Sequence, residues 1–392
     1  MRLFENLMAR ARPHFTDGGK FERVHQVYDA FNTFLFVPPD SATGTHIKDG
    51  IDLKRTMFTV VVAMIPCLMF GTWNVGHQRF VAMGELAGLF EGLVPKILYG
   101  SGVVVPLLIV SYAVGLGVEF AFAVVRNHPV NEGFLVTGML IPLIVPPTIP
   151  LWMVALATVF AVVIGKEAFG GTGMNILNVA LTARVFLFFA YPTYISGDQV
   201  WVSGDPDGFV DGLSGATPLG VSYLEGVEGL AASDVFSYGL RDLFLGAIPG
   251  SIGETSAIAI GIGALLLVMT GIGSVRIMAS TLVGAMGTAG LLYLLDIGPF
   301  QGVPPHYHLF MGSMLFATVF MATDPVTAAQ TEKGKLVYGF LIGVFGMIIR
   351  VLNPAYPEGW MLAILLMNVF APTIDHFVVQ ANIRRRLGRA LQ

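Results

Sequence analysis

The segment DGLSGATPLG brings together the groups that an esterification reaction needs. Thr217 offers a hydroxyl, and Ser214 lies three residues before it. Asp211, three residues before the serine, adds a carboxylate. Gly215 and Ala216 are small and leave the backbone open to a modifying enzyme. A surface turn is the alternative, because small polar residues of this kind are common in turns.

Four carboxylates lie in or beside apolar segments, namely Glu119, Asp29, Asp324 and Asp375. Acids within hydrocarbon are costly and usually functional. Their hard oxygen atoms suit Na⁺ or proton traffic and do not distinguish the two ions. The structural alternatives are pairing inside the bundle for Glu119 and a helix cap before Pro325 for Asp324. For Asp375 and Asp29 the alternative is solvation at the interface.

The segment GGTGMNILN presents backbone amides, a hydroxyl and the carboxamides of Asn175 and Asn178 at the start of an apolar segment. Such a helix start can hold a polar ring or a phosphate, and a simple helix cap is the alternative. Lys166 precedes this segment and is interpreted as a positive anchor at a span end. It does not pair with Glu167, because adjacent helical residues do not face each other.

The composition indicates a polytopic, all-α membrane protein. Of the 392 residues 54% are hydrophobic and only 12% are charged, about half the charged share of soluble domains, which is roughly 25%. The net charge of −4 argues against a nucleic-acid partner. Cys67 is the only cysteine, so neither an intrachain disulfide nor a thiolate metal site is expected. His306 and His308 are two residues apart and should point to different sides, so haem is not expected and both are interpreted as interfacial.

Apolar segments recur along the chain, and about 20 residues suffice to cross a bilayer. We predict ten spans, near 56–75, 102–125, 133–148, 150–166, 173–191, 255–273, 276–296, 307–323, 336–352 and 359–378. An amphipathic region, 1–55, precedes them, and a basic tail, 379–392, follows.

Basic residues set the orientation of the spans. Residues 1–55 contain eight Lys and Arg, and the tail carries Arg384, Arg385, Arg386 and Arg389. Both termini are therefore predicted to be cytoplasmic, which requires an even number of spans and agrees with ten. The segment 192–240 contains no Lys or Arg and is predicted to lie outside.

Two stretches of the chain resemble each other. TGMLIPLIVPP (137–147) is similar to GSMLFATVFMATDP (312–325), and an Asn triplet follows each, ILNVAL and VLNPAY. The copies begin at the third and the eighth predicted span, which is an offset of five spans. Because five is odd, the second copy enters the membrane from the opposite side and is inverted relative to the first. We therefore expect two inverted five-helix repeats, 56–191 and 241–378, with binding sites near the midplane at broken helices.

The order Asp-x-x-Ser-Gly-Ala-Thr resembles the signal for covalent attachment of FMN to a threonine. Further stretches resemble one membrane-protein family, namely DLKRTMFTV, NHPVNEGFLVT, IVPPTIPLW, FGGTGMNILN, FLFFAYP, IPGSIGE, FMATDPV and VLNPAYPEGWMLAILL. That family comprises the NqrB component of the sodium-translocating NADH:quinone oxidoreductase and the RnfD component of the Rnf complex. The similarity runs from the N-terminal region to the basic tail, and RVHQVYDAF favours the quinone-reductase branch.

The resemblance implies the cofactors and their sites. Thr217 would carry covalent FMN, within a motif completed by Asp211, Ser214, Gly215 and Ala216. Riboflavin would be the second, non-covalent flavin, with Asn175 and Asn178 as contacts. Gly115 and Leu116 would lie near the quinone, and Glu119, Asp29, Asp324 and Asp375 would line the sodium pathway.

The resemblance also implies the setting, a bacterial inner membrane with the 192–240 loop in the periplasm. The implied partners are subunits A, C, D, E and F of the complex, a flavin transferase that uses FAD, ubiquinone and Na⁺. The expected function is a redox subunit that couples electron transfer to ion movement. The rival hypothesis is a flavin-free channel or permease, since inverted repeats with broken spans serve small polar solutes equally well.

Overall fold

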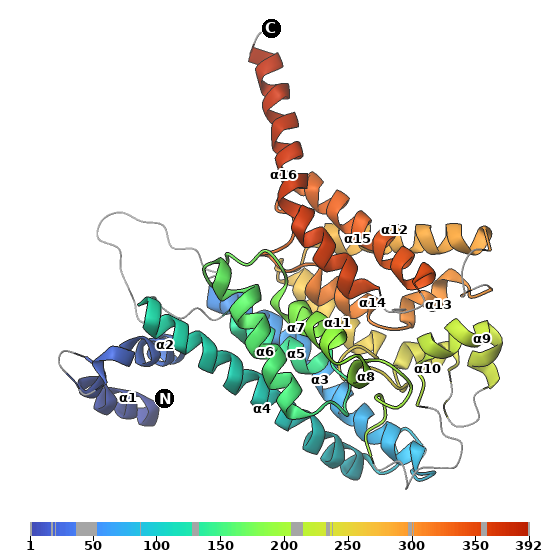
Figure 1. Ribbon diagram of the computed structural model, residues 1–392, viewed down its shortest axis with the longest axis horizontal. Coiled ribbons are helices and arrows are strands. Elements are labelled where there is room, and N and C mark those ends of the chain that lie inside the picture. The colour runs from blue at the N-terminus through green and yellow to red at the C-terminus, as the bar shows by residue number, and fades with distance from the viewer. Residues whose placement is uncertain are drawn as a thin grey trace.

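The computed structural model describes residues 2–16, 19, 21–36, 53–86, 88–127, 133–204, 215–232, 236, 238–296, 300, 302–353 and 359–390. Within these ranges the chain forms helices joined by turns and irregular segments, and no β-strand occurs (Figure 1). The prediction of an all-α polytopic membrane protein is confirmed.

Six helices in the described ranges are long and apolar enough to cross a membrane. One of them, α6, reaches this length together with the short 3₁₀ turn η2 (Glu167–Phe169) that follows it. They are α3 (Leu53–Ala82), α4 (Leu93–Arg126), α6 (Leu151–Gly165), α12 (Val275–Leu294), α15 (Glu332–Leu352) and α16 (Trp360–Ala390). α3 and α4 extend well beyond the predicted spans, and α16 continues through the segment predicted as a separate tail.

The other four predicted spans contain shorter helices. They are α5 (Phe134–Leu143), α7 (Val179–Ala190), α11 (Ala257–Met269) and the pair α14 (Met314–Phe316) and η4, a π-helix (Ala317–Met321). The ten residues of α5 rise about 15 Å, half the thickness of the hydrocarbon layer. These four segments are therefore interrupted helices, with Gly and Pro residues beside each of them, in agreement with the broken helices that the sequence predicted.

The starts of four helices are set by side-chain caps. Asn178, Ser256, Ser274 and Thr331 precede α7, α11, α12 and α15, and each side chain accepts a hydrogen bond from the backbone N–H three residues later. Ser, Thr and Asn favour this position because their side-chain oxygen satisfies an N–H group that the helix leaves unpaired.

The two halves of the chain meet through matching helices. α3 contacts α11, and α7 contacts α16. In the predicted repeats, α3 and α11 are the first helices of the two halves, and α7 and α16 are the fifth. Contacts between equivalent helices are what a two-fold relation between the halves predicts.

The remaining elements lie around this bundle. They are α1 (Arg2–Phe15), η1 (Glu22–Val24), α2 (His25–Phe36), α8 (Pro192–Ile195), α9 (Pro218–Ala232), α10 (Leu240–Leu245) and α13 (Pro305–Phe310). α1 and α2 lie at one edge of the molecule, whereas α9 lies at the other (Figure 1). The last turns of α16 project away from the bundle (Figure 1).

Candidate functional site

A pocket lies where the starts of α3, α5 and α7 meet the ends of α6, α11 and η4, and we call it the Asn178 pocket. Its polar side chains are Thr56, Thr137, Lys166, Thr172, Asn175, Asn178, Thr323 and Asp324. Its empty volume, including the part open to solvent, is about 800 Å³. Apolar residues such as Leu140 and Phe320 complete the wall. A mostly apolar wall with a few amides and hydroxyls is chemically suited to a flat polar ring such as a flavin.

The pocket brings together residues from two segments that the sequence analysis had selected separately, the Asn175 and Asn178 segment and Asp324. Asn178 Nδ2 lies 3.4 Å from Asp324 Oδ2, and Asn178 Oδ1 caps α7 by accepting from Leu181 N at 3.1 Å. Asn175 lines the same wall and donates to the Leu177 carbonyl at 3.1 Å. The predicted riboflavin contacts and one predicted ion ligand therefore share a single cavity.

Asp324 holds the turn that follows η4. Its carboxylate accepts from Val326 N at 3.1 Å and from Thr327 Oγ1 at 3.0 Å, in addition to the contact with Asn178. The prediction of a helix cap before Pro325 is wrong, because residues 325–327 form a turn and no helix begins there; the carboxylate stabilises this turn and lies on the wall of the pocket.

Glu119 is paired within the bundle. Its Oε1 forms an ion pair with Lys166 Nζ, and the two side chains are 4% and 5% exposed. The interpretation of Lys166 as an exposed anchor is wrong, because the chain turns at the end of α6 and directs the ammonium inward against α4. Lys166 also lines the Asn178 pocket.

The neighbouring Glu167 has a different partner on α4. Arg126 Nη1 donates to the Glu167 carbonyl at 2.8 Å and lies 3.4 Å from its Oε2. As the sequence predicted, Lys166 and Glu167 do not pair with each other, and each crosses to a different turn of α4.

A second pocket surrounds Thr217, and we call it the Thr217 pocket. Its lining includes Trp201, Thr217, Ser251, Glu254, Thr255 and Phe310. Its empty volume, including open solvent, is about 390 Å³. It lies at the starts of α9 and α11, the latter preceded by the IPGSIGE segment. Because α11 starts at this pocket and ends at the Asn178 pocket, the two pockets lie at opposite ends of α11.

The Thr217 hydroxyl lies at the N-terminus of α9. Its Oγ1 accepts from Gly220 N at 3.2 Å, and the side chain is partly exposed. Helix starts attract phosphate because their free N–H groups point outward. The preceding Ala216 is buried, and its carbonyl accepts from Tyr238 Oη at 2.6 Å. Asp211 and Ser214 lie outside the described residues.

Gly215 is required by close packing. A Cβ at this position would come within 2.5 Å of the Asp198 carbonyl oxygen and 3.3 Å of a Val202 methyl group. The glycine therefore allows the turn before Thr217 to lie directly on the 198–202 segment, which is a structural role.

The sequence analysis missed a buried ion pair beside the Thr217 pocket. Arg184 Nη1 lies 3.0 Å from both carboxylate oxygens of Glu254, and Nη2 lies 3.5 Å from Ser251 Oγ. An arginine inside a predicted span was the available signal, because such residues are rare and face the bundle interior. Arg184 lies six residues after Asn178 on α7, a rise of about 9 Å.

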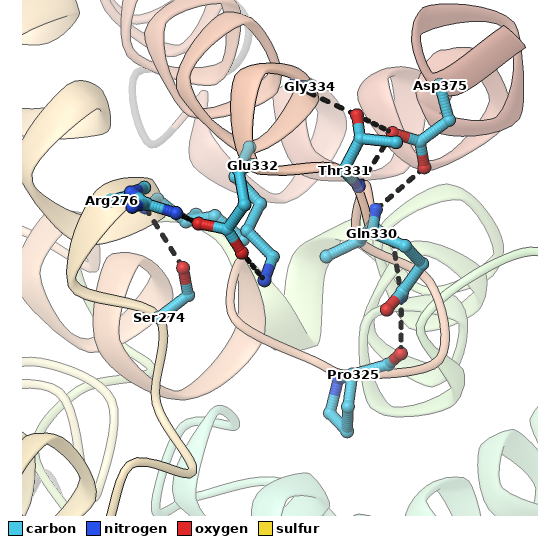
Figure 2. A network of polar contacts seen from close by, with 11 residues as sticks. Ser274, Arg276, Pro325, Gln330, Thr331, Glu332, Gly334 and Asp375 are labelled. Carbon is cyan, nitrogen blue, oxygen red and sulfur yellow. Dashed lines mark hydrogen bonds and ion pairs between the residues drawn. The ribbon is translucent and has the colours of Figure 1, made fainter. Parts of the chain in front are cut away.

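Asp375 anchors the segment that follows Asp324 (Figure 2). It lies on α16 and accepts from Gln330 N at 2.7 Å, Thr331 N at 3.0 Å and Thr331 Oγ1 at 2.5 Å. Gln330 Nε2 in turn donates to the Pro325 carbonyl at 2.7 Å. Asp375 thus fixes both the start of α15 and the turn that carries Asp324.

The other predicted site residues lie near α4. Asp29 is exposed on α2, which packs on α4 with the rings of Phe31 and Phe120 5.9 Å apart. Gly115 is buried against Phe134 of α5, and Leu116 is partly buried beside the core. Neither Gly115 nor Leu116 is among the residues that line the two pockets.

His306 and His308 point to different sides, as predicted. His306 is exposed, whereas His308 is buried with its ring 5.3 Å from that of Phe300. The interfacial interpretation is therefore wrong for His308, because Arg350 of α15 donates to its carbonyl at 2.8 Å and holds α13 against the bundle.

Comparison with known proteins gives a consistent result. Residues 41–384 match the model of the NQR2, RnfD, RnfE family. The chain is 47% identical over 404 residues to the B subunit of the Na(+)-translocating NADH-quinone reductase of Chromohalobacter salexigens, covering 98% of this chain and 96% of the relative. The B subunits of the same enzyme from Stutzerimonas stutzeri and Pseudomonas aeruginosa are 46% and 45% identical, covering 96% and 98% of both chains.

Proposed function

The chain belongs to the NQR2, RnfD, RnfE family, and from this membership we propose that it is a membrane subunit of a Na⁺-translocating NADH:ubiquinone reductase. It is a translocase component that works with subunits A, C, D, E and F. It carries FMN on Thr217 and riboflavin in the Asn178 pocket, delivers electrons to ubiquinone near Gly115 and Leu116, and couples this transfer to Na⁺ export.

One observation carries the proposal: two pockets with polar side chains in their walls lie at opposite ends of α11, and α7 links them. Asn178 at the start of α7 lines one pocket, and Arg184 contacts Ser251 and Glu254 of the other. A redox protein that moves electrons across a membrane needs sites at both ends with a short separation. Bound flavins supply the electron-transfer chemistry that side chains lack.

The residues around Thr217 fit a covalent phosphoester. The Oγ1 atom is partly exposed and lies at the start of α9, where backbone N–H groups favour a phosphate. A flavin transferase would join the FMN part of FAD to this oxygen and release AMP. Trp201 and Phe310 line the pocket and offer aromatic surfaces to a ring system.

In the Asn178 pocket, the carboxamides of Asn175 and Asn178 would hydrogen-bond the polar edge of riboflavin, and Thr137 and Thr172 its hydroxyl groups. We place the sodium pathway along Glu119, Asp324, Asp375 and Asp29. The bundle lies in the bacterial inner membrane, with both termini cytoplasmic and the Thr217 pocket periplasmic. The basic tail on α16 and the absence of Lys and Arg from 192–240 support this orientation.

Flavin on the denatured chain tests the central claim. The chain is produced together with the transferase, and its intact mass and in-gel fluorescence are compared with those of Thr217→Val. Thr255→Val removes another hydroxyl from the same pocket and is the matched control. We expect one FMN on the wild-type and control chains and none on Thr217→Val. An unmodified wild-type chain would instead favour a flavin-free channel or permease.

A further inference from the structure

Lys166 borders two different environments. Its ammonium forms the ion pair with Glu119 of α4, and its side chain also lines the Asn178 pocket. Of the described residues that line this pocket, Lys166 is the one cation and Asp324 is the one anion. A single positive charge is therefore within reach of a buried carboxylate and of whatever occupies the cavity.

The neighbouring carboxylates have partners of their own. Glu167 is held by Arg126 through two contacts of 2.8 and 3.4 Å. Asp324 accepts from Asn178, Val326 and Thr327. Among these groups, Lys166 is therefore the cation positioned to answer a change of charge in the pocket.

Glu119 loses a buried ion pair if the Lys166 ammonium moves away. Its side chain is 4% exposed, and breaking a buried ion pair is strongly disfavoured unless another cation takes the place of the one that leaves. Na⁺ can replace an ammonium in this role because carboxylate oxygens are suitable ligands for hard cations. Lysine suits such an exchange, since its charge is compact and its four-carbon stem is flexible.

We propose that Lys166 is an exchangeable counter-cation, shared between Glu119 and the occupant of the Asn178 pocket. When the occupant is neutral, the ammonium neutralises Glu119 and excludes Na⁺. When the occupant becomes negatively charged, the ammonium turns toward it, and Glu119 takes up one monovalent cation. No covalent bond changes, and one cation enters for each negative charge placed in the pocket.

This exchange rests on the proposed function, because its premise is that reduction of a bound flavin changes the charge in the Asn178 pocket. It assigns a cause to the coupling: the affinity of Glu119 for Na⁺ depends on where one lysine points. Coupling free energies between protein sites are typically equivalent to about 5- to 150-fold in affinity, and the exchange should fall in that range.

Equilibrium Na⁺ binding to the purified complex, oxidised or reduced with dithionite, tests the exchange. Glu119→Gln defines the part of binding that needs the carboxylate. In the wild type, reduction should raise this affinity about 5- to 150-fold. Lys166→Met should bind Na⁺ tightly in both states, with a ratio near one, and Lys166→Arg, which keeps a cation at this position, should still bind Na⁺ more tightly after reduction. A Lys166→Met complex that keeps the wild-type ratio would overturn the proposal.

Thermal unfolding of the oxidised complex at increasing Na⁺ gives a second readout if Lys166→Met folds poorly. Na⁺ should stabilise Lys166→Met more than the wild type, because Glu119 then lacks its ammonium partner. The double variant Glu119→Gln/Lys166→Met removes both charges and should respond no more than the wild type. Equal stabilisation of Lys166→Met and wild type by Na⁺ would contradict the exchange.

The flavin content of each preparation separates this inference from the proposed function. A wild-type chain without flavin would refute the proposed cofactors. The unfolding experiment uses Na⁺ alone, so it would still decide whether Lys166 and Na⁺ compete for Glu119.

Discussion

Asn178 Nδ2 and Asp324 Oδ2 lie 3.4 Å apart although 146 residues separate them in the sequence. One residue begins α7 in the first half of the chain, and the other ends the broken span of the second half. The Asn368 carboxamide of α16 is oriented so that its nitrogen donates to Tyr338 Oη and its oxygen accepts from the Asn178 backbone N–H at 3.1 Å. Asn178 thus joins both halves of the chain at the wall of one pocket.

Two substitutions of Asn178 should separate its roles. Asn178→Ser keeps an oxygen that can cap α7 but is too short to reach Asp324, whereas Asn178→Ala loses both interactions. We expect Asn178→Ala to unfold with a free energy about 1 kcal/mol lower than that of Asn178→Ser. Thermal unfolding of the detergent-solubilised complex measures the difference. Equal stability of the two variants would show that the cap contributes nothing.

The same variants predict the non-covalent flavin content. Both should lower riboflavin per chain, because each removes a carboxamide from the pocket. Asn175→Ala is the matched control: it removes a carboxamide from the same wall but leaves the α7 cap intact. Asn175→Ala should lower the riboflavin content per chain, and it should lower the free energy of unfolding by less than Asn178→Ala does. Unchanged riboflavin in all three variants would place the flavin elsewhere.

The buried Arg184–Glu254 pair should be costly to break. Arg184→Met leaves Glu254 buried without its guanidinium, and such losses typically cost about 3–5 kcal/mol. The double variant Arg184→Met/Glu254→Leu removes both charges and should recover much of the loss. Thermal unfolding of the three complexes provides the test, and a double variant less stable than Arg184→Met would contradict it.

Asp375 and Glu332 belong to the same polar network and should differ sharply in effect (Figure 2). Asp375→Leu removes the acceptor of three hydrogen bonds, each worth about 1.5–3 kcal/mol to a charged group, and should destabilise the complex clearly. Glu332→Gln breaks exposed ion pairs with Arg276 and Lys335 and should cost only about 0–1 kcal/mol. Comparable unfolding temperatures for the two variants would refute the anchoring role of Asp375.

Tyr238 should make stability depend on alkaline pH. Burial, and then the negative charge of Asp198, raise the pKa of the Tyr238 hydroxyl above its ordinary value of about 10. Folding therefore favours the protonated form. The stability it contributes is complete below about pH 10 and is lost as the pH rises toward the folded-state pKa.

The variant Tyr238→Phe lacks both this titration and the hydrogen bond to Ala216. It should be less stable than the wild type at pH 8, by about 1 kcal/mol. Above about pH 10 the gap should narrow, because only the wild type loses stability through this group. The free energy of unfolding of both proteins, measured from pH 8 to 11, tests this prediction. A difference between wild type and Tyr238→Phe that stays constant over this range would contradict it.

Much of the architecture was predictable because hydropathy and charge act over long segments. Each predicted span contains a helix, and Thr217, Asn175, Asn178 and Asp324 all lie at pockets. Capping also follows local rules, which is why Asn178 could be considered as a cap from the sequence.

The pairings between distant helices were not predictable. Lys166 at the end of an apolar span has the pattern of an anchor, and only the packing of α6 on α4 turns it toward Glu119. Arg184 and Glu254 are 70 residues apart, and no spacing rule joins them. Hydropathy also reports burial rather than backbone geometry, so it could not distinguish full spans from the short helices α5, α7 and α11.

The shortness of α7 has an electrical consequence. A membrane potential falls across the part of a protein that excludes water, and here α7 runs only 12 residues between its caps, about 18 Å. The hydrocarbon layer is about 30 Å thick. Moving one charge through the full potential involves about 2.3 kcal/mol per 100 mV. If water fills the pockets at both ends of α7, that voltage drop would be concentrated over these roughly 18 Å, and a small displacement of charge along α7 would do a large share of the work against the membrane field.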